Sequence, residues 1–251
     1  MSKYNNSYNY ISKDEYDLHF YDNFISDEAI IYCHGGAFRY GDKSDNIVFL
    51  AALSEKMSMR VYSVGYRNID DARSLKTMID DINDSINSIV RDDSISHFQI
   101  MGASSGAYLV WILSLLASNP EKYNYSTKYS VSSVTLISGY YLFKRHDPIT
   151  QMLCLFPAFQ DFPQELRNVD MNYTGLSNLP VLLITGTEDS CLEDSKVLYN
   201  SLQRSEATEV ELKIFESDAD KAEHCFIIER PETKISEEAF DCIHSFIKGE
   251  S

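Results

Sequence analysis

The sequence predicts an α/β fold in which a mostly parallel central sheet is flanked by helices. Apolar runs of strand length alternate along the chain with segments whose apolar residues repeat at helical spacing, which is the pattern of repeated βα units. Two of the runs, 29–33 and 180–185, are continuously apolar, as is typical of strands buried on both faces of a parallel sheet. The 251 residues contain no linker rich in Pro, Gly or Ser, so we expect residues 1–251 to form a single domain.

Seven segments are expected to form strands. The first and the last of them alternate polar and apolar residues, and for the last (VELKIF) this alternation predicts an edge strand with one solvated face. In chain order the predicted strands are 16–21, 29–33, 60–66, 98–101, 131–138, 180–185 and 210–215.

Five further segments carry apolar residues at helical spacing. Segment 74–90 has a single apolar stripe, whereas segment 108–118 is apolar nearly all round, which is typical of a helix packed inside a core. In chain order the predicted helices are 45–57, 74–90, 108–118, 192–204 and 235–248. Because strand–helix–strand crossovers between parallel strands are right-handed, we expect helices on both faces of the sheet.

Residues 140–179 interrupt this alternation. The stretch contains three prolines and many aromatic residues, and it lies between two predicted sheet strands. A long excursion in this place predicts a small, mostly helical cap rather than a disordered loop. Its aromatic side chains are expected both to pack the cap onto the body and to line a pocket.

The amino-acid composition restricts the kinds of molecule that the protein is expected to bind. The formal net charge of −16 argues against nucleic acid and anionic membranes. The five cysteines form no C-x-x-C pair and are interpreted as buried thiols, and the first residues lack the apolar segment of a signal peptide. The longest strongly apolar run is too short to cross a bilayer. We therefore expect a cytoplasmic protein without stable membrane association, metal or other cofactor. Its oligomeric state is left open.

Chemically useful residues follow four of the predicted strands. HGG at 34–36 follows the strand at 29–33, and GASSG at 102–106 follows the strand at 98–101. GTED at 186–189 follows the strand at 180–185, and the loop beyond the last strand leads to His224. Ligands of open α/β sheets bind at the carboxyl ends of the strands, so these four loops predict one site.

Ser104, Asp189 and His224 can supply a nucleophile, an orienting acid and a general base. A serine hydroxyl becomes a good nucleophile when a base takes its proton and a third group orients that base. Gly102 and Gly106 remove the Cβ atoms that would clash where the strand turns into the helix, so we expect Ser104 to project its Oγ from this turn.

Other residues compete for two of these roles. Glu188, Asp194 and Asp218 are the alternatives to Asp189 as the acid. His34 lies beside the two glycines of its own loop, and we expect it to brace that loop.

An oxyanion hole is expected from the backbone N–H groups of Gly35, Gly36 and Ser105. Ser105 begins the helix after the turn, where its N–H has no helical partner and the helix dipole is positive. The two glycines allow the backbone to approach a ligand closely and to point N–H groups at it.

The ordered set of motifs resembles the α/β-hydrolase fold and, within it, the hormone-sensitive-lipase-like branch of carboxylesterases. The similar segments are HGGAFRYGDK at 34–43 (oxyanion loop), SVGYRN at 63–68 (strand-end Tyr-Arg pattern), GASSGA at 102–107 (nucleophile elbow), GTEDSCLEDS at 186–195 (acid loop) and EHCF at 223–226 (catalytic histidine). The resemblance spans about residues 16–248 and implies small or medium carboxylic esters as substrates, with the Ser, Asp, His order of that fold.

Four features depart from the family pattern. Ala103 precedes the serine where an acidic residue is frequent, Ser105 follows it where alanine is frequent, and Ala37 takes the third glycine position of the oxyanion loop. The chain before Ala29 is short, so we expect the sheet to lack one of the usual antiparallel first strands.

The expected function is therefore the hydrolysis of small to medium acyl esters through an acyl-enzyme. The same three side chains would also serve an amidase of formamidase or peptidase type, or a deacetylase of acetylated sugars. The alternative from another class is a non-catalytic binding module on this fold. Against it stands the complete set of Ser, Asp and His, which a repurposed scaffold has no physical need to keep.

Overall fold

The computed structural model describes residues 8–21, 27–72, 74–142, 179–204, 209–217 and 219–250. Within these ranges the strands are β1 (Tyr8–Ser12), β2 (Tyr16–Tyr21), β3 (Glu28–Cys33), β4 (Val61–Val64), β5 (His97–Ala103), β6 (Ser130–Ile137), β7 (Val181–Gly186) and β8 (Val210–Phe215). The helices are α1 (Ile47–Met57), α2 (Ile69–Ala72), α3 (Leu75–Asp93), α4 (Ser105–Ser118), α5 (Pro120–Tyr123), α8 (Leu192–Arg204), α9 (Phe226–Glu229) and α10 (Lys234–Lys248).

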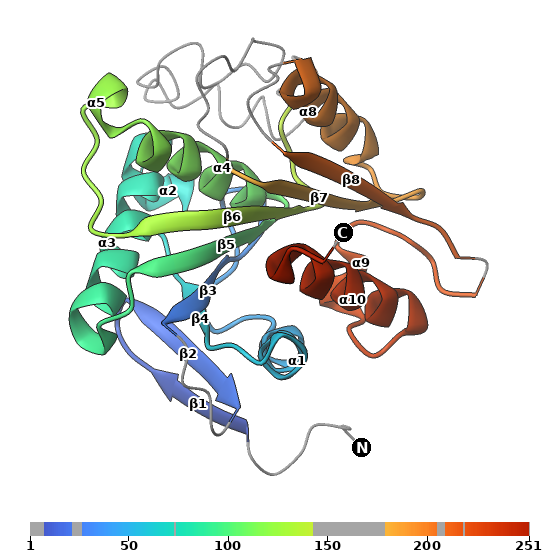
Figure 1. Cartoon of the computed structure of the whole chain (residues 1–251), viewed down its shortest axis with the longest axis horizontal. Coiled ribbons are helices and arrows are strands. Elements are labelled where there is room, and N and C mark those ends of the chain that lie inside the picture. Colours follow the sequence, from blue (N-terminus) through green and yellow to red (C-terminus); the bar gives the residue numbers. More distant parts are fainter. Residues whose placement is uncertain are drawn as a thin grey trace.

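The strands form one twisted sheet in the order β1-β2-β4-β3-β5-β6-β7-β8 (Figure 1). β2 runs antiparallel to both of its neighbours, whereas the six strands from β4 to β8 in this order are parallel to one another. The predicted fold class is therefore confirmed. β8 lies at one edge of the sheet, as the alternating pattern of this strand predicts, but Ile214 on its apolar side is 43% exposed.

Helices cover both faces of the sheet. α3, α4 and α8 pack on one face, and α1, α9 and α10 pack on the other (Figure 1). α4 is buried almost all round, with Trp111 fully enclosed, because nearly every one of its side chains is apolar. α3 and α10 bury only one stripe, since their apolar residues recur every three or four positions.

The predicted strands and the five longer helices are all present, with boundaries that differ by a few residues. α4 begins at Ser105, as expected from the turn, and its first three residues precede the apolar segment 108–118. The short helices α2, α5 and α9 have no counterpart in the sequence prediction. Each has about one turn, so its apolar residues cannot show a helical repeat.

The expectation that an antiparallel first strand is missing is wrong. β1 pairs with β2 along its whole length, with Tyr10 opposite His19. Tyr10 and Ile11 point to opposite faces of the sheet, and they are 42% and 45% exposed. β1 therefore has no buried face to mark it in the sequence, and its backbone hydrogen bonds to β2 hold it in place.

Most of the predicted cap lies outside the described residues. The structure describes only the two ends of the segment 140–179, which are Tyr140, Tyr141 and Leu142 after β6 and Leu179 before β7. Tyr140 and Tyr141 are buried at this point, as is Leu179.

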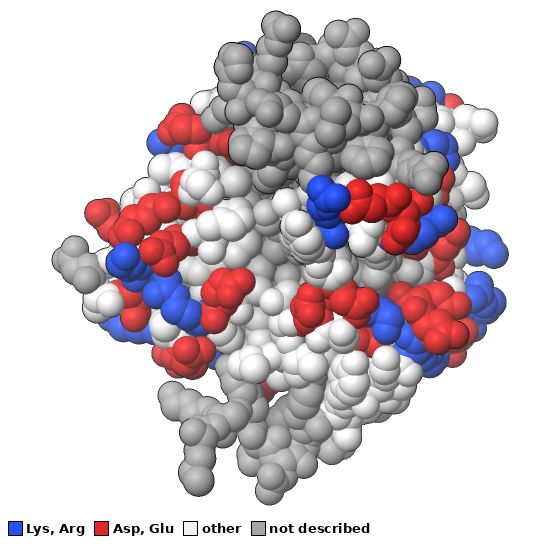
Figure 2. Space-filling view, turned by 180° about the vertical axis from the view of Figure 1, so that it is seen from behind, with Lys and Arg blue, Asp and Glu red and all other residues white. Residues whose placement is uncertain are grey.

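The surface is strongly acidic. Asp and Glu side chains are spread over the face seen in Figure 2 and are interspersed with Lys and Arg, without a continuous basic area among the described residues of that face. None of the helices in the described part of the chain has the length and the apolar character needed to cross a membrane.

An ion pair near the first strands ties the loop after β3 to the sheet. Lys43 Nζ lies 2.8 Å from Asp17 Oδ1, and the hydroxyl of Tyr10 donates to Asp17 Oδ2 at 2.8 Å. The Asp17 side chain is fully buried, whereas that of Lys43 is 15% exposed. Because Lys43 ends the segment 34–43, this contact fixes the far end of the loop that begins with the two glycines.

Replacing Lys43 with methionine is expected to lower the free energy of unfolding by about 3–5 kcal/mol, because it leaves the buried Asp17 carboxylate without its cation. Lys76→Met is the matched control, since Lys76 pairs with Asp80 on the exposed side of α3, where water already screens the charges. Urea unfolding followed by circular dichroism measures both variants. Equal losses in the two would contradict the assignment of a buried, structural pair at Lys43.

Candidate active site

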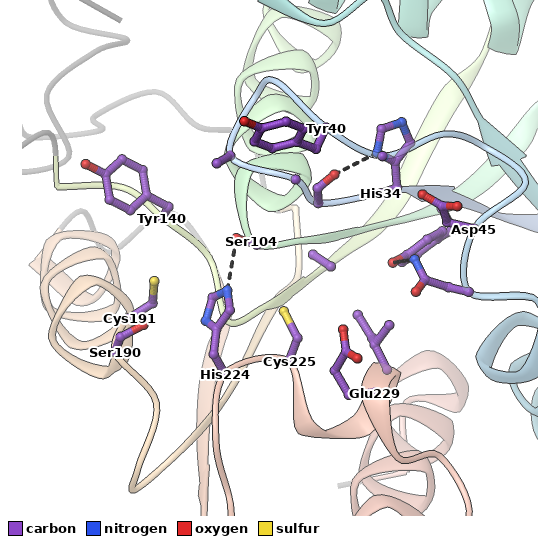
Figure 3. A pocket seen from close by; sticks show the side chains of 18 of the residues that line it. His34, Tyr40, Asp45, Ser104, Tyr140, Ser190, Cys191, His224, Cys225 and Glu229 are labelled. Atoms are coloured by element: carbon purple, nitrogen blue, oxygen red, sulfur yellow. Dashed lines mark hydrogen bonds between the residues drawn. The ribbon is translucent and has the colours of Figure 1, made fainter. Parts of the chain in front are cut away.

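Four loops at the carboxyl edge of the sheet surround one cavity. They follow β3, β5, β7 and β8, and they contribute His34, Ser104, Cys191 and His224 to its lining (Figure 3). The cavity has a volume of about 800 Å³. Parallel strands end at the same edge of a sheet, so motifs that are far apart in the sequence meet here.

Ser104 occupies the turn between β5 and α4 with φ of 51° and ψ of −120°. A residue with a Cβ adopts positive φ only where its surroundings enforce it. Here the Ser104 N–H donates to the carbonyl oxygen of Ile137 at 2.9 Å, and the Ser104 carbonyl accepts from the N–H of Ala107 at 3.1 Å. These bonds fix the turn, and the serine hydroxyl faces the cavity (Figure 3).

Gly102 and Gly106 are required by close contacts between backbone segments. A Cβ on Gly106 would lie 2.2 Å from the carbonyl oxygen of His34, and a Cβ on Gly102 would lie 2.5 Å from the carbonyl oxygen of Gly106. The turn therefore packs against itself and against the loop after β3. No side chain fits between these segments without moving one of them.

The structure brings the three predicted residues into one hydrogen-bonded chain. His224 Nε2 lies 3.0 Å from Ser104 Oγ (Figure 3), and His224 Nδ1 lies 2.8 Å from Asp189 Oδ1. When the Nδ1–H donates to the carboxylate, Nε2 is left as the acceptor that faces the serine hydroxyl. This arrangement allows the imidazole to take the serine proton.

Asp189 is buried among hydrogen-bond donors. Its Oδ2 accepts from the Thr185 hydroxyl at 2.9 Å, and its Oδ1 accepts from the Cys191 N–H at 2.8 Å. Burial by itself would raise the pKa of Asp189, but hydrogen bonds from His224, Ser138 and the Cys191 amide outweigh burial and hold this pKa below its ordinary value. Asp189 is therefore charged at neutral pH.

The same hydrogen bond acts in the opposite direction on His224. Burial would lower the pKa of its imidazole, but the hydrogen bond to Asp189, together with the neighbouring Cys191 and Cys225, outweighs burial and raises the pKa above the ordinary value. The protonated form of His224 is thus stabilised. An imidazole that holds a proton well in this place is suited to take one from Ser104 during a reaction.

The backbone at Gly35 and Gly36 passes directly beside Ser104. A Cβ on Gly35 would lie 3.1 Å from the Cβ of Ser104, and Gly36 has φ of +122°, where a Cβ would lie 1.9 Å from the carbonyl oxygen of Tyr40. Within the described residues, the N–H groups of Gly35 and Gly36 donate to no backbone acceptor. The N–H of Ser105 lies in the first turn of α4, where a helix leaves this group unpaired.

His34 contacts the glycine loop through both its ring and its backbone. Its ring stacks on that of Tyr66 with centroids 4.4 Å apart, and its Nδ1–H donates to the carbonyl oxygen of Gly35 at 2.7 Å. The Tyr66 hydroxyl donates to the His34 carbonyl at 3.1 Å. Next to Tyr66, Arg67 pairs with Asp81 at 2.7 Å. Tyr66 of the Tyr-Arg pattern at 63–68 therefore supports the loop that carries Gly35, whereas Arg67 joins this segment to α3.

Of the competing acids, the structure describes Asp194 and Glu188, and no hydrogen bond to His224 is seen for either, whereas Asp189 has one. Asp194 accepts hydrogen bonds from the N–H groups of Tyr141 at 2.9 Å and Leu142 at 2.6 Å, at the point where the chain leaves β6. Glu188 is exposed, and Asp218 lies outside the described residues.

Sequence reasoning missed Thr185 and Ser138. Both carry hydroxyls at the carboxyl ends of buried strands, Thr185 in β7 and Ser138 directly after β6. A hydroxyl side chain that ends an otherwise aliphatic strand next to a predicted catalytic loop is the signal that would have found them.

Two further groups line the cavity. Tyr40 and Tyr140 lie on one side of Ser104, and the carboxylates of Asp45 and Glu229 lie on the other (Figure 3).

In the described part of the chain, one group of side chains has the spacing of metal ligands. Asp189, Cys191 and His224 offer ligand atoms within 4.8 Å of one another. A metal ion bound here would compete with the hydrogen bonds that join Asp189, His224 and Ser104.

The fold and the arrangement of the site together define a class of protein. A mostly parallel sheet that carries a serine on a strand–turn–helix at its carboxyl edge, with Ser, Asp and His in this chain order, is typical of α/β-hydrolases. The family model for the alpha/beta hydrolase fold matches residues 30–228, and the chain belongs to this family. The family resemblance inferred from the sequence motifs is thereby confirmed.

Known proteins share this fold at low sequence identity. Esterase B from Lactobacillus rhamnosis is similar with a TM-score of 0.83 and 19% identity, over 98% of this chain and 88% of that one. An esterase/lipase from an uncultured bacterium is similar with a TM-score of 0.77 and 15% identity, over 99% and 87% of the two chains. Kynurenine formamidase of Saccharomyces cerevisiae is 21% identical over 141 residues, which cover 54% of this chain and 54% of that protein. This last match therefore spans about half the length of the curated relative.

Replacing Asp189 with asparagine is expected to lower the pKa of His224. The carboxylate stabilises the imidazolium, and an amide supplies no negative charge, so the proton leaves at lower pH in the variant. NMR titration of the His224 ring protons in both proteins measures this change, with the exposed His97 as a second signal in the same spectra. A His224 pKa that stays the same or rises in the variant would show that Asp189 does not set it.

Proposed function

We propose that the protein is a serine hydrolase that cleaves small to medium acyl esters through an acyl-enzyme. The hydrogen-bonded chain from Ser104 through His224 to Asp189, with contacts of 3.0 and 2.8 Å, carries this proposal. Ser104, at one end of this series of hydrogen bonds, lies on a strained turn. It is beside backbone N–H groups that are available to a ligand oxygen.

In the first half of the reaction, Ser104 Oγ attacks the ester carbonyl carbon while His224 Nε2 takes the hydroxyl proton. Asp189 holds the Nδ1–H tautomer and stabilises the imidazolium. The carbonyl oxygen becomes an oxyanion, which the N–H groups of Gly35, Gly36 and Ser105 stabilise. The intermediate then collapses, the ester C–O bond breaks, and the imidazolium gives its proton to the departing alkoxide.

The second half repeats these steps with water. His224 takes a proton from a water molecule, and the resulting hydroxide attacks the acyl carbon of the Ser104 ester. The same N–H groups stabilise the second oxyanion. When the C–Oγ bond breaks, Ser104 recovers its proton from His224 and the carboxylic acid leaves.

Two observations support esters of modest size as substrates. The cavity of about 800 Å³ lies within the range of small-molecule sites and has room for a short acyl chain together with a small alcohol. The names of the structural neighbours, an esterase B and an esterase/lipase, point to the same class of bond.

A formamidase-type amidase is the second candidate, and the partial match to kynurenine formamidase favours it. The same nucleophile and N–H groups serve a formamide carbonyl. Cleavage of a formamide differs from cleavage of an ester in the leaving group, because an amine departs only after His224 has protonated it.

We also propose that the enzyme works in a reducing compartment, the cytoplasm. Cys33, Cys191, Cys225 and Cys242, the cysteines of the described residues, are free thiols. Proteins of oxidising compartments use cysteines mainly in disulfides.

Replacing Ser104 with alanine is expected to lower kcat by roughly 10⁴- to 10⁶-fold, because the variant has no hydroxyl to form the acyl-enzyme. The measurement is the hydrolysis of p-nitrophenyl esters of increasing acyl length by both proteins. Ser114→Ala is the control, since Ser114 is a buried serine of α4 whose hydroxyl donates to the carbonyl of Val110. Ester hydrolysis that survives in Ser104→Ala would contradict the mechanism.

The same assay with a matched formamide separates the two candidate functions. Higher kcat/KM for an aryl formamide than for the corresponding formate ester would favour the amidase, and the reverse would favour the esterase. If wild type turns over neither compound and a fluorophosphonate fails to label Ser104, the proposed function is wrong.

Gly36→Ala is expected to lower kcat by about 10²- to 10³-fold, the usual effect of losing one oxyanion donor. The added Cβ would stand 1.9 Å from the Tyr40 carbonyl, so the loop must move and carry its N–H groups away from Ser104. Gly65→Ala is the control, because a Cβ there meets only the Lys43 side chain at ordinary contact distance. The loss should appear in kcat for the best p-nitrophenyl ester, and equal activity of the two variants would contradict it.

A further inference from the structure

Backbone strain marks a residue that the mechanism above does not use. Within the described residues, nine residues other than glycine have positive φ. Six of them are cap residues of helices: Ser58, Ser94 and Asn124 at C-caps, where this conformation is frequent, and Asn46, Ser104 and Cys225 at N-caps. The other three, Ala37, Phe38 and Ser138, lie in the loops after β3 and β6.

Ser138 is the polar residue among these three. It has φ of 50°, it directly follows β6, it caps no helix, and it is fully buried. Its N–H donates to the carbonyl oxygen of Ile184 at 2.8 Å, which holds the backbone against β7. Strain of this kind persists where the surrounding structure enforces it, and it is concentrated at functional sites.

The hydroxyl of Ser138 joins two catalytic loops. Its Oγ accepts a hydrogen bond of 2.9 Å from the N–H of Cys225, the residue next to His224. The same side chain lies close enough to the carboxylate of Asp189 to help hold the pKa of that group below its ordinary value. A hydroxyl that accepts from the Cys225 amide keeps its own proton, which is available to this carboxylate.

The residues around Ser138 also hold the third loop. The N–H of Ser104 donates to the carbonyl oxygen of Ile137 at 2.9 Å, and the N–H of Tyr140 donates to the carbonyl oxygen of Ser104 at 3.3 Å. This contact follows from the topology, because β6 lies between β5, which leads to Ser104, and β7, which leads to Asp189. Residues 137–140 therefore contact the loops of the serine, the acid and the histidine.

We propose that Ser138 is a positioning residue, whose hydroxyl holds the Asp189 carboxylate and the backbone next to His224 in the geometry that aligns the imidazole with Ser104. The inference rests on the proposed function for its effect on turnover, but its effect on the His224–Asp189 contact is independent of any substrate. A purely structural role would instead require only that Ser138 fill space and satisfy the Cys225 amide.

Two variants separate these roles. Ser138→Ala and Ser138→Gly lose the same hydroxyl, but glycine relieves the positive φ whereas alanine keeps the strain, so the glycine variant should be the more stable of the two. If Ser138 positions the acid and the base, both variants should lose kcat by about 10- to 100-fold with little change in KM, whatever their melting temperatures. If its role is structural, activity should follow stability and Ser138→Gly should remain close to wild type.

Ser133→Ala is the matched control. Ser133 is a buried serine of β6 itself, and its hydroxyl is bonded to Gln99, away from the cavity. It should keep wild-type kcat.

The substrate-independent readout is the low-field NMR signal of the His224 Nδ1 proton, which the hydrogen bond to Asp189 produces. We expect this signal to move upfield and broaden in Ser138→Ala and Ser138→Gly but not in Ser133→Ala. An unchanged signal in both Ser138 variants would overturn the inference. If wild type hydrolyses no ester or formamide, this experiment still tests Ser138, so failure of the proposed function and failure of the inference give different results.

Discussion

Close approach of backbone segments at the carboxyl edge of the sheet is the constraint on which the site depends. Gly106 lies so near the His34 carbonyl that a Cβ would stand 2.2 Å from it, and a Cβ on Gly35 would stand 3.1 Å from that of Ser104. Because the segments after β3 and β5 meet without side chains between them, a hydroxyl and several backbone N–H groups share one small volume. In the proposed reaction, the substrate carbonyl group would contact both.

The strain at this edge is offset by the structure around it. A serine with φ of 51° is costly by itself, by roughly 1–3 kcal/mol. β5 and α4, the elements on either side of Ser104, are buried almost completely, so the turn between them has no freedom to relax. The apolar core thus supplies the rigidity that holds a reactive side chain in an unfavourable backbone conformation.

Two buried carboxylates, Asp17 and Asp189, have partners of different kinds, and the two pairs serve different purposes. Asp17 is neutralised by a permanent cation, Lys43, at 2.8 Å. Asp189 is surrounded by neutral donors from Thr185 and Cys191, and it faces a histidine. Because no Lys or Arg of the described residues pairs with Asp189, the favourable partner for its charge there is a proton on His224. The first arrangement fixes a loop, whereas the second favours proton transfer.

The sequence by itself determined the fold class, the order of the main strands and helices, and the grouping of four motif-bearing loops at one edge of the sheet. These follow from the spacing of apolar residues and from the residue types in the turns, which are local properties of the chain. It also indicated Ser104 and His224, since glycines and neighbouring motifs mark them. It missed β1, whose exposed Tyr10 and Ile11 give no apolar pattern. Only the tertiary structure showed that Asp189 is hydrogen-bonded to His224 and that the Ser138 hydroxyl accepts from the Cys225 N–H, because these contacts join residues more than 30 positions apart in the sequence.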